Sequence, residues 1–228
     1  MENIPKHIVL FPDGNRRWAK NRGLDSLIGH KQGDKNLIDF VQWCIDKKIK
    51  ILTAFGFSTE NWKRSKQEVG YLMNLFEVTL REYLEKFKEN GIRVTIIGQK
   101  ERLPYKLQEI IKGAEFETKN NDKFYLNLAV SYGGRWDILN AVKKIVEEKI
   151  PAKDITDELF ESHLSTAGLP DPDLIIRAGG QMRLSNFVLW QGAYAELYFS
   201  PKLWPDFTED DLDAALEEFD KRARRFGK

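Results

Sequence analysis

Short apolar runs rich in β-branched and aromatic residues alternate along this chain with longer stretches in which apolar residues recur at helical spacing. The runs Ile51–Phe55 and Arg93–Ile97 predict strands that are covered on both faces. In Glu209–Arg222 the apolar residues recur every three or four positions, which predicts a helix with a core-facing stripe. The acidic start and basic end of that stretch suit the helix dipole, which explains the basic cluster near the C-terminus without a ligand.

The same two patterns predict strands and helices over the whole chain. Strands are predicted at His7–Phe11, Ile51–Phe57, Ile92–Gly98, Phe124–Val130, Asp173–Arg177 and Glu196–Phe199. Helices are predicted at Gly29–Lys48, Lys66–Asn90, Tyr105–Lys119, Arg135–Lys149, Asp157–Ala167 and Glu209–Arg222. Strands separated by helices indicate βαβ units, so we expect an α/β fold with an open, largely parallel six-stranded sheet surrounded by helices. No linker, repeat or low-complexity tract interrupts the pattern, which favours a single domain over residues 1–228.

Composition narrows the class of protein. The 228 residues carry 36 Lys and Arg against 35 Asp and Glu, for a net charge of +1. Nucleic acid is not expected as a partner, because nucleic-acid-binding domains usually show a basic excess. Cys44 is the only cysteine, so the chain has neither an internal disulfide nor a cysteine-rich zinc site, and its apolar neighbours predict a buried thiol. No apolar run approaches the ~18 residues of a membrane span and no signal-peptide pattern opens the chain. We expect a cytoplasmic enzyme, with contact to a membrane surface left open.

Polar segments follow four of the predicted strands. They are Pro12–Trp18, Ser58–Arg64, Ser131–Asp137 and Ala178–Asn186. Ligands of open parallel sheets bind beyond the carboxyl ends of the strands. Three of the four segments carry arginine with glycine or serine, so the strand ends are predicted to form an anion-binding cleft that also contains carboxylates.

The first of these segments places a carboxylate, Asp13, directly after a strand and before the turn residues Gly14 and Asn15. Asp13 can hold a Mg²⁺ ion that bridges diphosphate oxygens, while Arg16 and Arg17 add positive charge. A helix beginning soon afterwards would favour a phosphate at its N-terminus. By itself Asp-Gly-Asn is also an ordinary turn, and the residues alone leave both interpretations open.

Two further groups are candidates for the site. Arg177, Arg183 and Ser185 surround a Gly-Gly turn in the way a phosphate clamp would, although unrelated arginines in a surface loop give the same pattern. Glu60-Asn61-Trp62 offers a carboxylate, an amide and an indole within one turn, but is also typical of a helix start.

His30 is either a phosphate donor or a structural histidine. The chain has no Walker A motif, no Gly-x-Gly-x-x-Gly after the first strand, no Gly-x-Ser-x-Gly and no histidine pair at metal-binding spacing. These absences disfavour a P-loop kinase, a dinucleotide oxidoreductase and an α/β-hydrolase.

Taken together, the segments resemble the cis-prenyltransferases, and among them the bacterial undecaprenyl diphosphate synthases. The match runs in order from about His7 to Gly227. The motifs that carry it are Asp13-Gly-Asn-x-Arg-Trp18, Gly29-His30-Lys31, Phe57-Ser-Thr-Glu-Asn-Trp62, Asn127-Leu-Ala-x-x-Tyr-Gly-Gly-Arg-Trp-Asp137, Leu174-Ile-Ile-Arg177, Arg183-Leu-Ser-Asn-Phe-x-Leu-Trp-Gln191 and Ala193-Tyr-Ala-Glu-Leu-Tyr-Phe199.

The resemblance implies the cis-prenyltransferase fold with an apolar tunnel, usually as a homodimer. It implies Mg²⁺-dependent condensation of isopentenyl diphosphate with an allylic diphosphate, foremost farnesyl diphosphate, with new cis double bonds. The product would be a polyprenyl diphosphate such as undecaprenyl diphosphate, the carrier lipid of cell-wall synthesis, which is delivered to the membrane. Helices Gly29–Lys48 and Lys66–Asn90 would line the tunnel, and Phe116 and Phe124 would narrow it.

The resemblance also assigns roles to individual residues. Asp13 would be the Mg²⁺-linked catalytic aspartate, Asn61 the proton acceptor, and Glu196 a second Mg²⁺-linked carboxylate on the side that faces the partner. The allylic diphosphate would be bound by Gly14, Asn15, Arg16, Arg17, Trp18 and His30. The substrate site would be shaped by Ser58, Thr59, Glu60, Trp62 and Arg64. Isopentenyl diphosphate would be held by Arg177, Arg183 and Ser185.

Three positions depart from the family pattern. Arg16 stands where the family has a small glycine, Ser26 where it commonly has an arginine, and Gln181 where it has a glutamate. Arg16 is expected to replace the positive charge that is missing at Ser26. The departures keep two alternatives open: a short-chain or irregular prenyl diphosphate synthase, and a non-catalytic partner subunit of a prenyltransferase.

Overall fold

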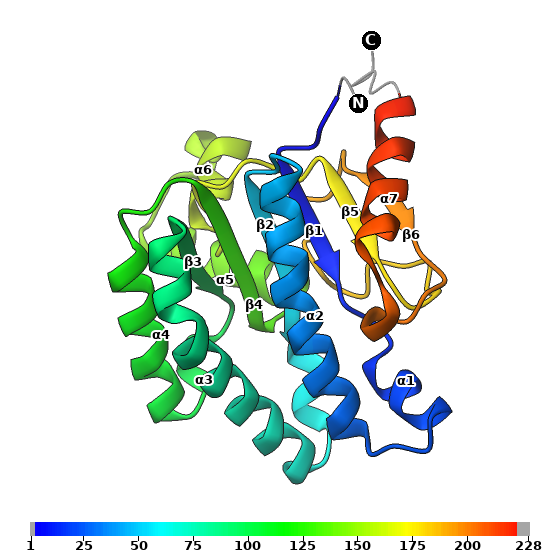
Figure 1. The fold of residues 1–228 in the computed structure, drawn as a ribbon. Helices are drawn as coiled ribbons and strands as arrows, with labels where there is room; N and C mark the ends of the chain where they lie inside the picture. The colour runs from blue at the N-terminus through cyan, green and yellow to red at the C-terminus, as the bar shows by residue number, and fades with distance from the viewer. Residues whose placement is uncertain (1–2, 223–228) are drawn as a thin grey trace.

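The chain forms one six-stranded sheet with helices on both faces, as described by a computed structural model for residues 3–222 (Figure 1). The strand order is β3-β4-β2-β1-β5-β6, and every strand pairing is parallel. The strands are β1 (His7–Phe11), β2 (Ile51–Ser58), β3 (Ile92–Ile97), β4 (Phe124–Tyr132), β5 (Leu174–Arg177) and β6 (Glu196–Phe199). The predicted α/β fold is confirmed, and each predicted strand is present to within two residues.

The helices follow the predicted pattern with three differences. They are α1 (Asn15–Asn21), α2 (Ser26–Asp46), α3 (Lys66–Glu89), α4 (Tyr105–Thr118), α5 (Gly134–Glu147), α6 (Asp157–His163) and α7 (Glu209–Lys221). Short 3₁₀ turns lie at η1 (Thr59–Lys63), η2 (Lys100–Arg102), η3 (Ala152–Asp154) and η4 (Trp204–Asp206). Helix α1 was not predicted, because seven residues are too few to show a helical period. Helix α2 begins earlier than predicted because the Asp25 side chain caps it, accepting a 2.8 Å bond from the Leu27 amide, and α6 ends earlier, at His163.

Helices α2, α3, α4 and α7 cover one face of the sheet, and α5 and α6 cover the other (Figure 1). Strand β1 serves both layers: Ile8 and Leu10 belong to the larger core cluster, whereas Val9 and Phe11 belong to the opposite one. The central strands are mostly apolar because both of their faces are buried. The stripe predicted on the last helix packs into the larger cluster, and the buried thiol predicted for Cys44 is confirmed.

The carboxyl ends of the central strands lie side by side at one edge of the sheet. Phe11 pairs with Arg177, and Ser58 pairs with Tyr132. The polar segments that follow these strands are therefore gathered at this edge, close to α1 and to the first turns of α2 and α3 (Figure 1). Glu196 pairs with Leu174 at the opposite, amino-terminal end of its strand. Among residues 3–222 there is no helix with the length and apolar character to cross a membrane.

Candidate active site

Asp13 stands in the loop between β1 and α1 and accepts hydrogen bonds from two arginines. Arg177 Nη2 donates to its Oδ2 at 2.9 Å, and Arg17 Nη2 lies 3.3 Å from its Oδ1. The side chain is 35% exposed, so the carboxylate still faces solvent. The next residue, Gly14, has φ +114°, and a Cβ there would lie 2.8 Å from Leu203 Cδ2. The turn that presents Asp13 therefore requires glycine at this position.

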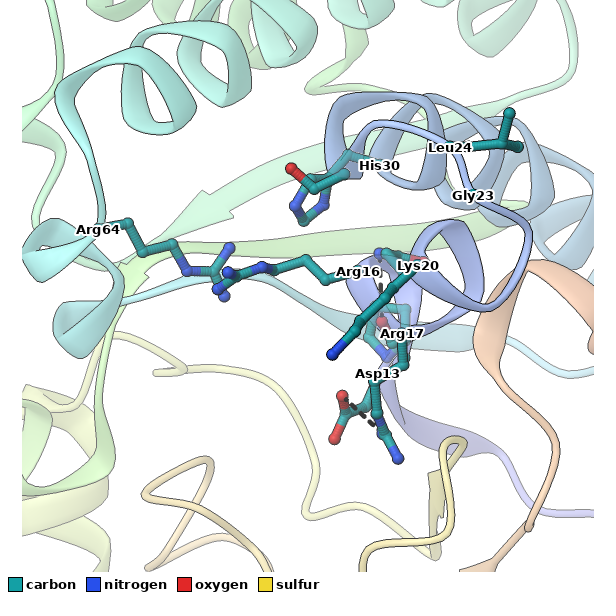
Figure 2. A pocket seen from close by; sticks show the side chains of 12 residues that line it. Asp13, Arg16, Arg17, Lys20, Gly23, Leu24, His30 and Arg64 are labelled. Carbon is teal, nitrogen blue, oxygen red and sulfur yellow. Dashed lines mark hydrogen bonds and ion pairs between the residues drawn. The ribbon is translucent and has the colours of Figure 1, made fainter.

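A cavity of about 690 Å³ opens beside Asp13, and four cations, Arg16, Arg17, Lys20 and Arg64, belong to its lining. Figure 2 shows Arg16 and Arg64 reaching toward each other, with Lys20 and Arg17 on the side of Asp13. Like charges held this close repel each other unless an anion lies between them. The cavity thus has the charge and the fork-shaped donors that bind a diphosphate.

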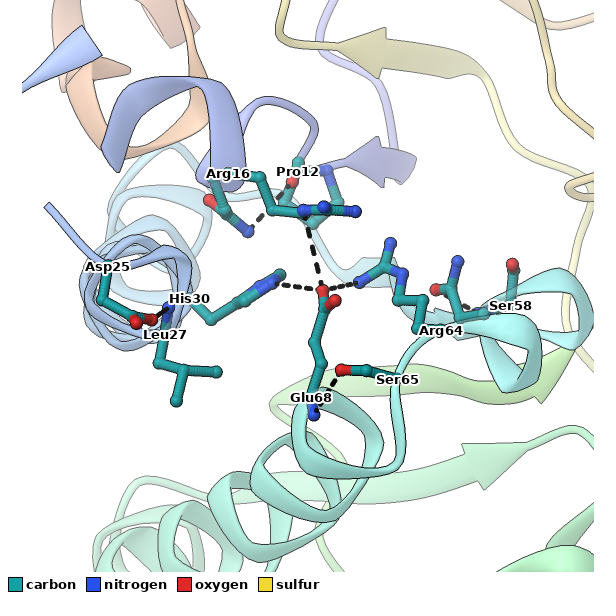
Figure 3. Close-up of polar contacts among 11 residues, drawn as sticks. Pro12, Arg16, Asp25, Leu27, His30, Ser58, Arg64, Ser65 and Glu68 are labelled. Atoms are coloured by element: carbon teal, nitrogen blue, oxygen red, sulfur yellow. Dashed lines mark hydrogen bonds and ion pairs between the residues drawn. The ribbon is translucent and has the colours of Figure 1, made fainter. Parts of the chain in front are cut away.

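A part of the positive charge is balanced by Glu68 in the first turn of α3 (Figure 3). Its buried Oε1 lies 3.0 Å from Arg64 Nη1, 3.2 Å from His30 Nε2 and 3.9 Å from Arg16 Nε. Burial lowers the pKa of His30, and burial likewise lowers the pKa of Arg64. A neutral His30 therefore donates its Nε2 hydrogen to Glu68, and the carboxylate fixes the orientation of all three groups.

Arg177, at the end of β5, is the most buried cation of the site and is only 5% exposed. Besides Asp13 it donates through Nη1 to Ser185 Oγ at 2.8 Å and to the backbone oxygen of Arg183, and its guanidinium lies over the Phe11 ring. Its Nε has no hydrogen-bond partner among residues 3–222. Arg177 therefore ties the first strand-end segment to the segment after β5.

A second cavity, of about 560 Å³, adjoins the first and has largely apolar walls. The two share Pro12, Asp13, Asn15, His30 and Arg64. Its apolar lining residues are Phe11, Leu37, Phe55, Phe57, Leu72, Leu75, Phe76 and Trp204. The two helices predicted to line an apolar tunnel, α2 and α3, thus do line this cavity.

Phe116 and Phe124 were expected to narrow this tunnel, and both expectations are wrong. Phe116 is 67% exposed on α4 and lies under the Lys119 ammonium group. Phe124 is fully packed in the core at the start of β4, and neither side chain lines the cavity.

The end of β2 and the turn η1 bring three candidate residues to the wall of the apolar cavity: Ser58 from β2, and Glu60 and Asn61 from η1. The Ser58 amide donates to Asn61 Oδ1 at 3.1 Å, which fixes the amide side chain. Asn186 Nδ2 donates to Glu60 Oε1 at 2.8 Å, so the segment after β5 also holds η1 in place. Hydrogen bonding lowers the pKa of Glu60 in spite of partial burial, which keeps it charged.

Four residues that the resemblance assigns to substrate binding do not line either cavity: Trp18, Thr59, Trp62 and Arg183. Trp18 donates its indole hydrogen to Asp206 at 2.6 Å, and Trp62 donates its own to Ser131 at 2.9 Å. Neither indole lines the two cavities, because each is held against the protein by this bond. Thr59 and the exposed side chain of Arg183 also lie outside both linings.

Glu196, the expected second metal ligand, is not near Asp13 within one chain. It lies at the start of β6 and accepts a 2.9 Å bond from Arg222 Nη1. Residues 3–222 contain no group of three or more His, Cys, Asp and Glu side chains that could hold a metal ion. Among the described residues that line both cavities, Asp13 is the one carboxylate.

Four residues that line or complete the site are not among the sequence-predicted candidates: Lys20, Asp34, Glu68 and Asn186. Lys20 lies four positions after Arg16, a spacing that would have been informative if α1 had been recognised. Glu68 has the position of an ordinary first-turn acid, since its amide donates to the Ser65 cap.

A family model described as "Putative undecaprenyl diphosphate synthase" matches residues 11–227. The chain is 49% identical to an isoprenyl transferase of Thermotoga maritima, with 98% of this chain and 97% of that protein covered. It is 44% identical to a (2E,6E)-farnesyl-diphosphate-specific ditrans,polycis-undecaprenyl-diphosphate synthase of Legionella pneumophila, with 98% and 96% covered.

Solved structures agree with these relatives. The lavandulyl diphosphate synthase of Lavandula x intermedia, in complex with dimethylallyl diphosphate, superposes with a TM-score of 0.95 at 42% identity, with 99% of each chain covered. A probable undecaprenyl diphosphate synthase of Campylobacter jejuni gives a TM-score of 0.82 at 39% identity, with 100% of each chain covered. Sequence, fold and site therefore agree, and the chain belongs to the undecaprenyl diphosphate synthase family of cis-prenyltransferases.

Proposed function

We propose that this chain extends an allylic diphosphate, with farnesyl diphosphate as the primer, by condensation with isopentenyl diphosphate to give a cis-polyprenyl diphosphate such as undecaprenyl diphosphate. The observation that carries the proposal is the junction of two unlike cavities at Asp13, one lined by cations and one lined by apolar side chains. An allylic diphosphate has the same two parts. Its diphosphate suits Arg16, Arg17, Lys20 and Arg64, while its hydrocarbon tail suits the space between α2 and α3.

The residues at this junction supply the charge stabilisation that the reaction needs. As the allylic C–O bond breaks, negative charge grows on the departing diphosphate, and arginines already in place stabilise it without reorganising. Arg177 and Ser185 would hold the diphosphate of isopentenyl diphosphate beside it. The alkene attacks the allylic carbon, and loss of a proton completes the new double bond. Glu60 and Asn61 face this space and are the groups that would receive or relay the proton.

Asp13 fits a Mg²⁺ ion by its donor chemistry. Mg²⁺ in phosphate-handling sites is usually held by one or two carboxylates together with phosphate oxygens and water. Bound there, the ion would neutralise charge on the diphosphate. Within one chain Glu196 lies at the start of β6 and accepts from Arg222, so in the homodimer that we propose it would join Asp13 from the second subunit. The apolar product would be released to a membrane surface.

Product analysis tests this function directly. Purified protein is incubated with Mg²⁺, labelled isopentenyl diphosphate and, in separate reactions, dimethylallyl, geranyl, farnesyl or geranylgeranyl diphosphate. We expect repeated additions with farnesyl diphosphate. If no primer gives a product, the chain is not a catalytic subunit by itself. A short-chain synthase is the second candidate, because about 560 Å³ is the size of a cavity for a small ligand, and a product that stops after one or two additions would support it.

Arg16 is expected to supply charge that family members commonly take from an arginine at the position of Ser26. Both residues line the cationic cavity, so a guanidinium can reach the same space from either. Arg16→Gly is expected to raise the KM for the allylic diphosphate by about ten-fold, the loss of one charge-assisted hydrogen bond. Steady-state kinetics with varied primer measures this value.

The double variant Arg16→Gly/Ser26→Arg is the matched control for Arg16→Gly, because it restores the family arrangement. It is expected to return the KM of the primer to within a few-fold of the wild-type value. An unchanged KM in Arg16→Gly alone would contradict the compensation.

A further inference from the structure

A carboxylate, Asp34, lies in the wall of the second cavity, in its part between α2 and α3. It follows His30 by four residues on α2, which places it about 6 Å further along the helix from the cationic mouth. The two other carboxylates of this lining, Asp13 and Glu60, belong to the strand-end segments at the mouth. Asp34 is thus the carboxylate that an apolar tail would meet inside the cavity.

Asp34 lies one turn before the last α2 residue of this lining. The lining on α2 stops at Leu37 and the lining on α3 stops at Phe76. One turn beyond Phe76, Thr79 donates its hydroxyl hydrogen to Asp34 Oδ2 at 2.7 Å. This hydrogen bond joins α2 to α3 beside the cavity, beyond the α3 residues that line it.

The surroundings of Asp34 make contact with hydrocarbon costly. No ion pair to Asp34 is formed among residues 3–222, and Glu82 on α3 adds charge of the same sign. Burial raises the pKa of Asp34 to about 6, so the group is still largely ionised at neutral pH. A tail that fills the space beside it would remove its remaining water and leave the Thr79 hydroxyl as its main partner.

We propose that the Asp34–Thr79 pair limits the length of the prenyl chain that this cavity accepts. The inference rests on the proposed prenyl elongation and adds to it the residue pair that opposes further growth. Earlier additions fill the apolar part of the cavity and are unaffected. Later additions must push hydrocarbon against the carboxylate or separate α2 from α3.

Two variants of Asp34 separate the effect of its charge on product length from the effect of its size. Asp34→Leu puts a bulkier but apolar side chain in the wall, and Asp34→Asn keeps the size and removes the charge. If the charge limits the chain, both variants lengthen the mean product by at least one isoprenyl unit. If size limits it, Asp34→Leu shortens the product and Asp34→Asn leaves it unchanged. Asp39→Asn, on the exposed side of the same helix, is the matched control and should not change the product.

The pH dependence of product length provides a second measurement, which holds even if Asp34→Leu fails to fold. Lowering the pH from about 8 to about 5 neutralises a carboxyl with a pKa of about 6, so wild-type products are expected to lengthen. Thr79→Val removes the hydrogen bond that favours the charged form, so this change should occur at higher pH. The other titratable groups around Asp34 are His30 on α2 and Tyr71, Glu82 and Tyr83 on α3.

Asp34→Asn retains all of those groups and should abolish the change in product length with pH. Active Asp34 variants with wild-type product lengths at every pH would overturn the inference and leave the proposed elongation intact. If the wild-type protein forms no product with any primer, the elongation itself fails.

Discussion

Asp13→Ala is expected to lower kcat/KM for prenyl transfer by at least about a thousand-fold, which would leave activity near the detection limit. The carboxylate stands where the cationic and apolar cavities meet, and it is the group through which a Mg²⁺ ion would bind the diphosphate. It also accepts from Arg17 and Arg177, so its loss leaves two guanidiniums without their anion. Incorporation of labelled isopentenyl diphosphate with farnesyl diphosphate, at several Mg²⁺ concentrations, measures the effect.

Asp13→Asn separates the role of the charge from that of the loop. The amide keeps an oxygen that can accept from an arginine, so the turn and the Arg177 contact should be largely preserved. It is a poor Mg²⁺ ligand, and its activity should be nearly as low as that of alanine, with a smaller change in Tm. Activity of either variant within ten-fold of the wild type would show that Asp13 is not the metal-linked group.

The strands of this fold could be predicted because the physics that forms them is local. Each central strand is a short apolar run bounded by polar residues, as burial on both faces requires. The convergence of their polar ends followed from parallel pairing alone. Helix α1 is too short to be predicted from its sequence pattern. Without that helix, nothing in the sequence places Arg16 and Lys20 on the same helical face, so Lys20 was not predicted to line the cationic cavity.

Other parts of the site depend on contacts between distant segments and could not be predicted. The family resemblance assigns Trp18 to the allylic diphosphate and Trp62 to the substrate site. In the structure each indole N–H donates to a residue that is distant in sequence: Trp18 donates to Asp206, and Trp62 donates to Ser131. Glu68 has the sequence position of an ordinary helix-start acid, whereas the two arginines and the histidine around its carboxylate come from other segments of the chain. The placement of Glu196 was likewise decided by strand register.

Arg177→Lys is expected to reduce kcat/KM by about a hundred-fold, although the charge is kept. The guanidinium makes three directed contacts at once, to Asp13, to Ser185 and to the backbone oxygen of Arg183. A lysine ammonium is a point donor that cannot reproduce this fork. We expect most of the loss in the KM for isopentenyl diphosphate, because the segment after β5 is the part proposed to bind it. The contact to Asp13 should add a smaller loss in kcat.

Arg177→Ala tests how much of the fold depends on the same side chain. Removing one partner of a buried ion pair costs about 3–5 kcal/mol. Because Asp13 is 35% exposed and water can replace the lost partner, we expect a smaller loss, about 1–3 kcal/mol, in urea denaturation. Ser185→Ala, which removes a single contact, should lower kcat/KM by only about ten-fold.

Arg183→Ala tests whether the Arg183 side chain takes part in substrate binding by the segment after β5. In the structure Arg183 contributes a backbone oxygen to Arg177 and its side chain is exposed, so a purely structural role predicts wild-type stability and KM. The resemblance instead assigns its side chain to isopentenyl diphosphate, which predicts a raised KM with unchanged stability. A raised KM in Arg183→Ala would mean that the segment closes over the bound diphosphate, with Arg177 as the fixed point about which it moves. A wild-type KM would place the whole clamp on Arg177 and Ser185.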